Sequence, residues 1–212
     1  MKITLKVLLG AAIILLVYMC YRSIMGSIEF ETEKKLRESA IQARLIDIRK
    51  AQIEYKNIFG THAANFDELK KFLTETKLPF IIKEGELTDE QLEKGMTEKK
   101  AIKEGLKGFR RDTSWVLAKD TLFGAQFNAD SLSVVPVAGV KAYFSMDTAT
   151  LSSASGYTVK VFESGVRYET YLSDLDKQQL INLKDKAAKL KKYDGLRVGS
   201  VTEINNNAGN WE

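Results

Sequence analysis

The sequence predicts an α+β protein in which an N-terminal transmembrane helix continues into a long amphipathic helix. This helix is expected to pack on a small antiparallel sheet, followed by a C-terminal helix. Three observations lead to this prediction: an apolar N-terminal segment, no Pro or Gly in residues 28–59, and short strand-like pieces between turn signals in the second half. The chain has 212 residues, 44% hydrophobic and 28% charged, which suffices for an anchor and a folded domain.

The N-terminal apolar segment has the composition of a membrane span. No charged residue lies between Lys6 and Arg22, and apolar residues extend the segment to the range 3–25. A spanning helix needs about 20 predominantly apolar residues, and this range reaches that length when both basic side chains extend toward the headgroups. We therefore expect residues 1–27 to form a transmembrane anchor.

The residues around this segment bear on its processing and orientation. A cleaved secretory signal peptide is the alternative to an anchor, but it needs small residues at the cleavage site, where this chain has Met19 and Tyr21. Lys2 and Lys6 precede the segment, and positive charge favours the cytoplasmic side. We expect a retained, single-pass anchor in the inner (cytoplasmic) membrane, with residues 28–212 forming one extracytoplasmic (periplasmic) domain.

The stretch after the anchor predicts the helix that carries the core of this domain. Helix-forming residues dominate from residue 28 to residue 59, and Gly60 is a typical C-terminal stop. Its apolar side chains recur at the spacing of one helical face. This stripe consists of Ile41, Leu45, Ile48, Tyr55 and Phe59.

Capping residues predict two further helices. Asn65 followed by Glu68 predicts a short helix over 66–76, and Ser173 predicts a last helix that reaches residue 193. A mostly charged run predicts a helical insertion at 83–108, which we interpret as a solvated face.

Alternating residues and turn signals predict the sheet. Glu163-Ser164-Gly165 is interpreted as a tight turn between two of its strands. The predicted strands cover 114–118, 132–137, 141–146, 156–163 and 166–171.

Residue types that carry catalysis or metal binding are few and scattered. His62 is the only histidine, and Cys20, the only cysteine, lies in the apolar segment, which excludes a His/Cys zinc spacing. The chain has no glycine-rich phosphate loop and no Gly-x-Ser-x-Gly motif. The net charge of +4 comes from interleaved lysines and acids, a pattern that argues against nucleic-acid binding. We therefore expect no enzyme activity, catalytic residue, metal or cofactor.

Part of the chain resembles a known family. Ile53-Glu54-Tyr55-Lys56-Asn57-Ile58-Phe59-Gly60-Thr61-His62 and then Asn65-Phe66-Asp67-Glu68-Leu69 follow an apolar segment and an amphipathic helix. Over residues 41–72 this order resembles the N-terminal part of type IV pilins and type II secretion pseudopilins. The resemblance implies a long helix that ends in a Tyr…Gly turn, a short helix and an antiparallel sheet. The chain departs from pilin precursors in that Gly26 follows the apolar run.

The C-terminal half has a second resemblance. The segments 166–172, 195–200 and 205–212 resemble those of an uncharacterised bacterial membrane-anchored family. That resemblance implies a membrane-anchored protein and no particular activity.

These features predict a non-enzymatic structural or assembly subunit of a bacterial cell-envelope apparatus, similar in layout to pilins. The alternative is a membrane-tethered module that binds a peptide, a glycan or a partner protein. We expect the membrane, envelope proteins or further copies of the chain as partners. The candidate interface residues are Ile41, Leu45, Ile48, Tyr55, Phe59 and Trp211.

Overall fold

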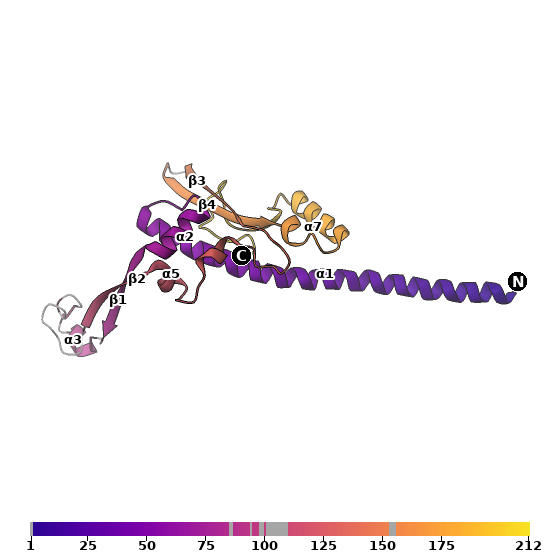
Figure 1. The fold of residues 1–212 in the computed structure, drawn as a ribbon, viewed down its shortest axis with the longest axis horizontal. Coiled ribbons are helices and arrows are strands. Elements are labelled where there is room, and N and C mark those ends of the chain that lie inside the picture. The colour runs from indigo at the N-terminus through magenta and orange to yellow at the C-terminus, as the bar shows by residue number, and fades with distance from the viewer. Residues whose placement is uncertain (1, 85–86, 94, 98–99, 101–109, 153–155) are drawn as a thin grey trace. The chain divides into compact units, whose positions relative to one another are not determined.

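The computed structural model describes residues 2–84, 87–93, 95–97, 100, 110–152 and 156–212 (Figure 1). The fold is α+β, which confirms the predicted class. The chain divides into two compact units, the first with Met1–Phe66 and Asp130–Glu212, the second with Asp67–Ala129. The predicted insertion falls inside the second unit, and the single-domain interpretation of residues 28–212 stays a prediction.

Helix α1 (Lys2–Phe59) is one continuous helix of 58 residues. It passes through Gly26 without a break, so the apolar N-terminal segment and the amphipathic segment form one rod. The helix ends where Gly60 adopts a φ of 71° and its amide donates to the Lys56 carbonyl at 2.8 Å. Glycine adopts this left-handed conformation without a side-chain clash, which explains the stop.

A three-stranded antiparallel sheet packs on α1 within the first unit. Its spatial order is β3 (Ser145–Ser152), β4 (Thr158–Arg167) and β5 (Gly195–Gly199). Val166 pairs with Leu196 across β4 and β5, and both strands contact α1. The predicted arrangement of a long helix on a small antiparallel sheet is therefore confirmed.

The predicted turn at Glu163-Ser164-Gly165 is wrong, and the reason is steric. Strand β4 runs through these residues, with Gly165 opposite Ser145 on one side and Arg197 on the other. A Cβ at Gly165 would come within 2.8 Å of the Arg197 Cβ. The glycine thus permits close approach of strands rather than a reversal of the chain. The predicted strand over 166–171 instead ends at residue 167, where helix α6 (Tyr168–Tyr171) follows.

The segment before β3 is less regular than predicted. Residues 129–133 form the short 3-10 helix η1 (Ala129–Ser133). The predicted strands 132–137 and 141–146 meet at an isolated bridge between Val134 and Tyr143, and regular pairing begins at β3. Segment 129–144 therefore leads into the sheet without forming two of its strands.

The chain after α6 contains the predicted C-terminal helix, α7 (Lys177–Lys189). Its N-cap is Asp176, which accepts a hydrogen bond from the Gln179 amide at 2.9 Å, and not Ser173. After β5 the polar tail folds back on that strand. The Asn210 side chain accepts from the Arg197 amide at 3.0 Å and donates to the Gly195 carbonyl at 2.8 Å.

The second unit is built on a two-stranded antiparallel ladder, in which Lys77 pairs with Leu117. Its first helix confirms the prediction for 66–76, and its buried face consists of Leu69, Phe72 and Leu73. Much of the predicted insertion at 83–108 lies outside the described residues. The elements are α2 (Phe66–Glu75), β1 (Lys77–Glu84), α3 (Asp89–Glu93), β2 (Arg110–Leu117) and α5 (Ala118–Leu122).

Candidate functional site

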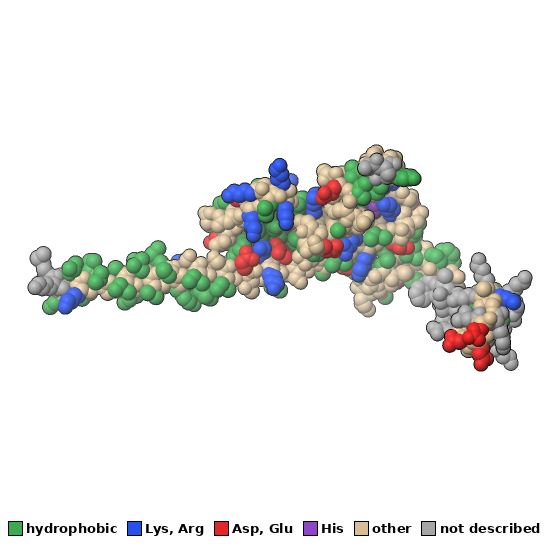
Figure 2. Space-filling view, turned by 180° about the vertical axis from the view of Figure 1, so that it is seen from behind, with side chains coloured by type: hydrophobic (Ala, Val, Ile, Leu, Met, Phe, Trp, Pro, Cys, Tyr) green, Lys and Arg blue, Asp and Glu red, His purple; other side chains and the backbone are tan. Residues whose placement is uncertain are grey.

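The N-terminal half of α1 is an exposed apolar rod. Within the described residues, α1 is the one helix long and apolar enough to span a membrane, and its most apolar 18-residue window has a mean hydropathy of 2.4. None of that window is buried against the rest of the protein. Figure 2 shows hydrophobic side chains along this half of the helix. These properties are consistent with membrane association through α1.

The predicted interface stripe on α1 divides between core and surface. Ile41, Leu45 and Ile48 are fully buried in the core of the first unit. Tyr55 is half-buried, and Phe59 is 52% exposed, with their ring centroids 4.6 Å apart. The first three residues therefore pack within the chain, while Phe59 stays accessible. Their roles as interface residues stay predictions.

Trp211 belongs to the folded tail. The ring lies over Gly209, where a Cβ would come within 2.5 Å of the indole. The neighbouring Glu212 accepts from Arg49 of α1 at 2.7 Å, which fixes the end of the chain to the helix. Trp211 is half-buried in this arrangement, and its role as an interface residue stays a prediction.

Gln52 fixes the chain that leaves α1. Its side chain is fully buried, donates to the Ala63 carbonyl at 3.0 Å and accepts from the Ala63 amide at 3.0 Å. Both polar groups of that buried residue are thereby satisfied. The loop after Gly60 is held against the helix by these two bonds.

Arg37 is the main polar link between α1 and the segment before α7. Its guanidinium donates to both carboxylate oxygens of Asp174, at 2.6 and 2.8 Å, and to the Tyr171 carbonyl at 2.7 Å. Glu33, one turn earlier, accepts from Arg37 Nε at 2.9 Å. The hydrogen bond to Arg37 lowers the pKa of the Asp174 carboxyl. Bidentate pairs of this kind are stronger and more specific in geometry than single bonds.

The same region contains a buried tyrosine–carboxylate contact. Tyr171 is fully buried and donates from its hydroxyl to Glu38 at 3.1 Å. Burial raises the pKa of both groups. The two residues lie next to Arg37 and Asp174, so four polar groups join α1 to the α6–α7 segment.

His62 is buried under the sheet. It is 4% exposed, its ring centroid lies 4.8 Å from that of Phe162, and neither ring nitrogen has a hydrogen-bond partner in the described part of the chain. Burial, helped by the nearby charge of Lys56, lowers the pKa of His62 to about 4. The backbone at Gln52 and Lys160 favours the protonated ring and partly offsets this lowering of the pKa, although it forms no hydrogen bond with the ring. His62 is therefore neutral at physiological pH.

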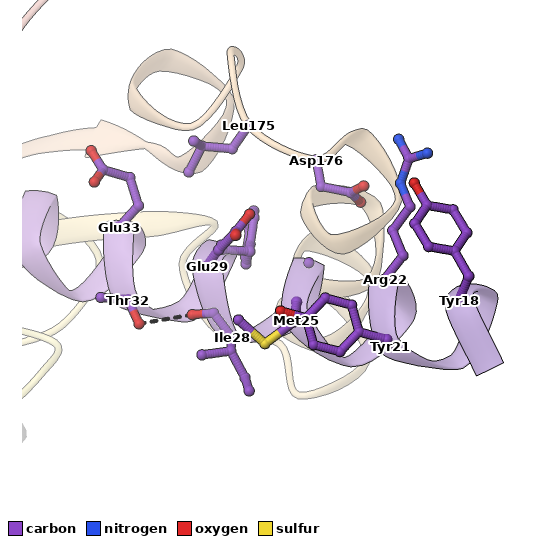
Figure 3. A pocket seen from close by; sticks show the side chains of 12 residues that line it. Tyr18, Tyr21, Arg22, Met25, Ile28, Glu29, Thr32, Glu33, Leu175 and Asp176 are labelled. Atoms are coloured by element: carbon purple, nitrogen blue, oxygen red, sulfur yellow. Dashed lines mark hydrogen bonds between the residues drawn. The ribbon is translucent and has the colours of Figure 1, made fainter.

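A crevice of about 880 Å³ lies where the apolar half of α1 meets the start of α7. In Figure 3, Tyr18, Arg22 and Glu33 project from α1 toward the side that carries Leu175 and Asp176. The crevice thus combines apolar walls with charges of both signs. Its lining residues are Tyr18, Tyr21, Arg22, Met25, Gly26, Ile28, Glu29, Phe30, Thr32, Glu33, Leu175 and Asp176.

The residues of these polar links and of the crevice were not predicted as functional. Tyr18, Arg22 and Glu29 recur on one face of a helix, which is a signal that the sequence does contain. The pairing of Arg37 with a carboxylate 137 positions later leaves no local signal. Among the described residues, no group of three His, Cys, Asp or Glu side chains is placed to hold a metal ion. The expectation of no cofactor stays a prediction.

Comparison with known proteins adds no functional information to this geometry. No protein-family model, no curated protein and no solved structure matches the chain. The long N-terminal helix followed by a small antiparallel sheet is nevertheless a pilin-like layout.

Proposed function

We propose that this chain is a non-enzymatic, membrane-anchored structural or assembly subunit of a bacterial cell-envelope apparatus, similar to pilins and pseudopilins. The anchor lies in the inner membrane, with the N-terminus in the cytoplasm and the domain outside it. The support for this orientation is the pair Lys2 and Lys6 at the N-terminal end of the span.

One observation carries the proposal: apolar side chains stay exposed on α1 beyond the span. Ile28 is 52% exposed and Leu36 is 68% exposed, although both lie on the segment that leads from the membrane into the core. They share a face with Thr32 and Ser39, whose small side chains let another helix approach closely. A face of this kind suits packing against α1 of a neighbouring subunit in the same membrane.

The continuity of α1 also supports this proposal. The same helix is exposed and apolar in its first half and is the spine of the core in its second half. An unbroken helix transmits the orientation of the anchor to the folded unit, so subunits that pack through their anchors would also align their domains. Such coupling is useful in an assembly and unnecessary in a tethered binding module, for which a flexible linker suffices.

Site-specific photocrosslinking in intact cells tests the proposal. A photoreactive amino acid at Ile28 or Leu36 should give crosslinked species containing the full chain, in the fraction that resists alkaline extraction from membranes. The matched control position is Asn182, which is exposed on α7. Crosslinks at neither α1 position, with the chain still in the membrane fraction, would favour the tethered binding module.

A further inference from the structure

The position of the crevice along α1 places it relative to the membrane that the candidate span would cross. With a rise of 1.5 Å per residue, about 20 residues cross the roughly 30 Å hydrocarbon layer, so a span that starts near Ile3 leaves it near Arg22. Glu29 lies seven residues further, or about 10 Å along the axis. Helical side chains tilt toward the N-terminus, which brings Glu29 back toward the headgroup layer, whereas the long Arg22 side chain extends from the hydrocarbon edge toward the headgroups. The positive group of Arg22 thus lies at the edge of the hydrocarbon layer, and the negative group of Glu29 lies beyond that edge, toward the headgroups.

Two of the four charged groups in the crevice are already used within the protein. Glu33 accepts from Arg37 at 2.9 Å, and Asp176 accepts from the Gln179 amide at 2.9 Å. Arg22 and Glu29, in contrast, have no hydrogen bond or ion pair among the described residues. The crevice therefore presents one free guanidinium and one free carboxylate.

Gly26 leaves the space between these two groups open. A Cβ built at Gly26 meets no atom within 4 Å, so none of the other described residues fills the volume beside it. Tyr18 and Tyr21 frame the membrane side of the crevice, where amphipathic rings prefer to lie. The result is an amphipathic recess of ligand size at the level of the headgroups.

We propose that this crevice binds the headgroup of a phospholipid that carries a primary ammonium group, with its phosphate at Arg22 and its ammonium at Glu29. This inference rests on the proposed anchoring of the chain. A guanidinium suits a phosphate, and a carboxylate accepts hydrogen bonds from a primary ammonium but not from a quaternary one. Net anionic headgroups are disfavoured because Glu29, Glu33 and Asp176 repel them. The acyl chains then lie along the exposed apolar half of α1.

Lipid competition on the full-length protein tests the inference. The chain is reconstituted into vesicles of equal parts phosphatidylethanolamine, phosphatidylcholine and phosphatidylglycerol. After gentle extraction, native mass spectrometry counts the lipids that each molecule retains. The wild type should retain one phosphatidylethanolamine, about tenfold in excess over each of the other two, a ratio that corresponds to a modest difference in binding.

Three variants test separately the carboxylate, the guanidinium and the open space of the crevice. Glu29→Gln should abolish the preference for phosphatidylethanolamine over phosphatidylcholine, and Arg22→Gln should abolish retention of either lipid. Gly26→Leu fills the recess, leaves all charges in place and favours the helix, so its loss of lipid cannot be ascribed to unfolding. The matched controls are Gly10→Leu, a second open glycine of α1, and Glu31→Gln, an exposed acid outside the crevice lining; both should retain lipid as the wild type does.

The outcomes distinguish this inference from the proposed function. Equal retention of all three lipids, preferential retention of phosphatidylglycerol, or unchanged retention in Glu29→Gln and Gly26→Leu would each overturn the headgroup site. If the chain floats with vesicles but retains no lipid, the site fails while the anchoring stands. If the chain does not float with vesicles, the proposed function fails as well.

Discussion

Arg37 on α1 and Asp174 before α7, separated by 137 positions in the sequence, form a bidentate ion pair with N–O distances of 2.6 and 2.8 Å. The arginine side chain is 10% exposed, whereas the aspartate is 56% exposed. The pair is therefore buried on the side of the helix and open on the side of the loop. It joins the rod to the segment that forms one wall of the crevice.

Arg37→Met should destabilise the first unit by about 1–3 kcal/mol. The methionine keeps much of the apolar stem but removes the donors to Asp174 and to the Tyr171 carbonyl. The measurement is the denaturant midpoint of the full chain in detergent. Lys34→Met is the control, because its pair with the exposed Glu31 is worth less than about 1 kcal/mol. Equal effects of the two substitutions would contradict the assigned role of Arg37.

Two leucines on the same helix test the division of α1 into core and surface. Leu45→Ala removes a fully buried side chain and should lower the free energy of unfolding by about 2–5 kcal/mol. Leu36→Ala, at a position that is 68% exposed, should change it by less than about 0.5 kcal/mol. Thermal melting of both variants provides the comparison. A large loss at Leu36 in the dispersed monomer would mean that this residue belongs to the core.

Gln52→Leu should destabilise the loop after α1, although leucine is apolar and similar in size. The substitution leaves the buried amide and carbonyl of Ala63 without their partners, at a cost of about 2–4 kcal/mol. Hydrogen exchange should show faster exchange of the Ala63 amide in the variant. Gln178→Leu on the exposed face of α7 is the control. An unchanged exchange rate at Ala63 would show that the two bonds do not hold the loop.

His62 should make the protein less stable as the pH falls. Its pKa is about 4 in the folded protein and about 6.5 when unfolded, so the unfolded chain binds the extra proton first. The stability due to neutral His62 is present above about pH 6.5 and is lost progressively as the pH falls toward 4. Between about pH 7.5 and pH 5 the loss should be about 2 kcal/mol.

Urea unfolding of the wild type and of His62→Phe at both pH values measures this loss. The phenylalanine keeps an aromatic contact with Phe162 and cannot titrate. Between the two pH values, the free energy of unfolding should fall less in His62→Phe than in the wild type, because the contribution of His62 is absent. The decrease due to carboxyl groups should be the same in both proteins. Equal pH dependence in the two proteins would refute the role of His62.

The sequence alone determined the elements that depend on short-range periodicity and local stops. The continuous helix to Phe59, its end at Gly60, and the short helix that starts at Phe66 all follow from spacing and caps within a few residues. The apolar N-terminal half of α1 was equally evident, because composition and length alone make a helix a candidate membrane span.

Only the tertiary structure decided features that depend on non-local approach. Gly165 has the local context of a turn, and only its two neighbouring strands show that it is needed for packing inside β4. Likewise, the stripe from Ile41 to Phe59 is periodic throughout, but the fold decides which of its members are covered. The Arg37–Asp174 pair and the crevice around Gly26 arise where segments more than a hundred residues apart meet, and no pattern within one segment encodes the distance between them.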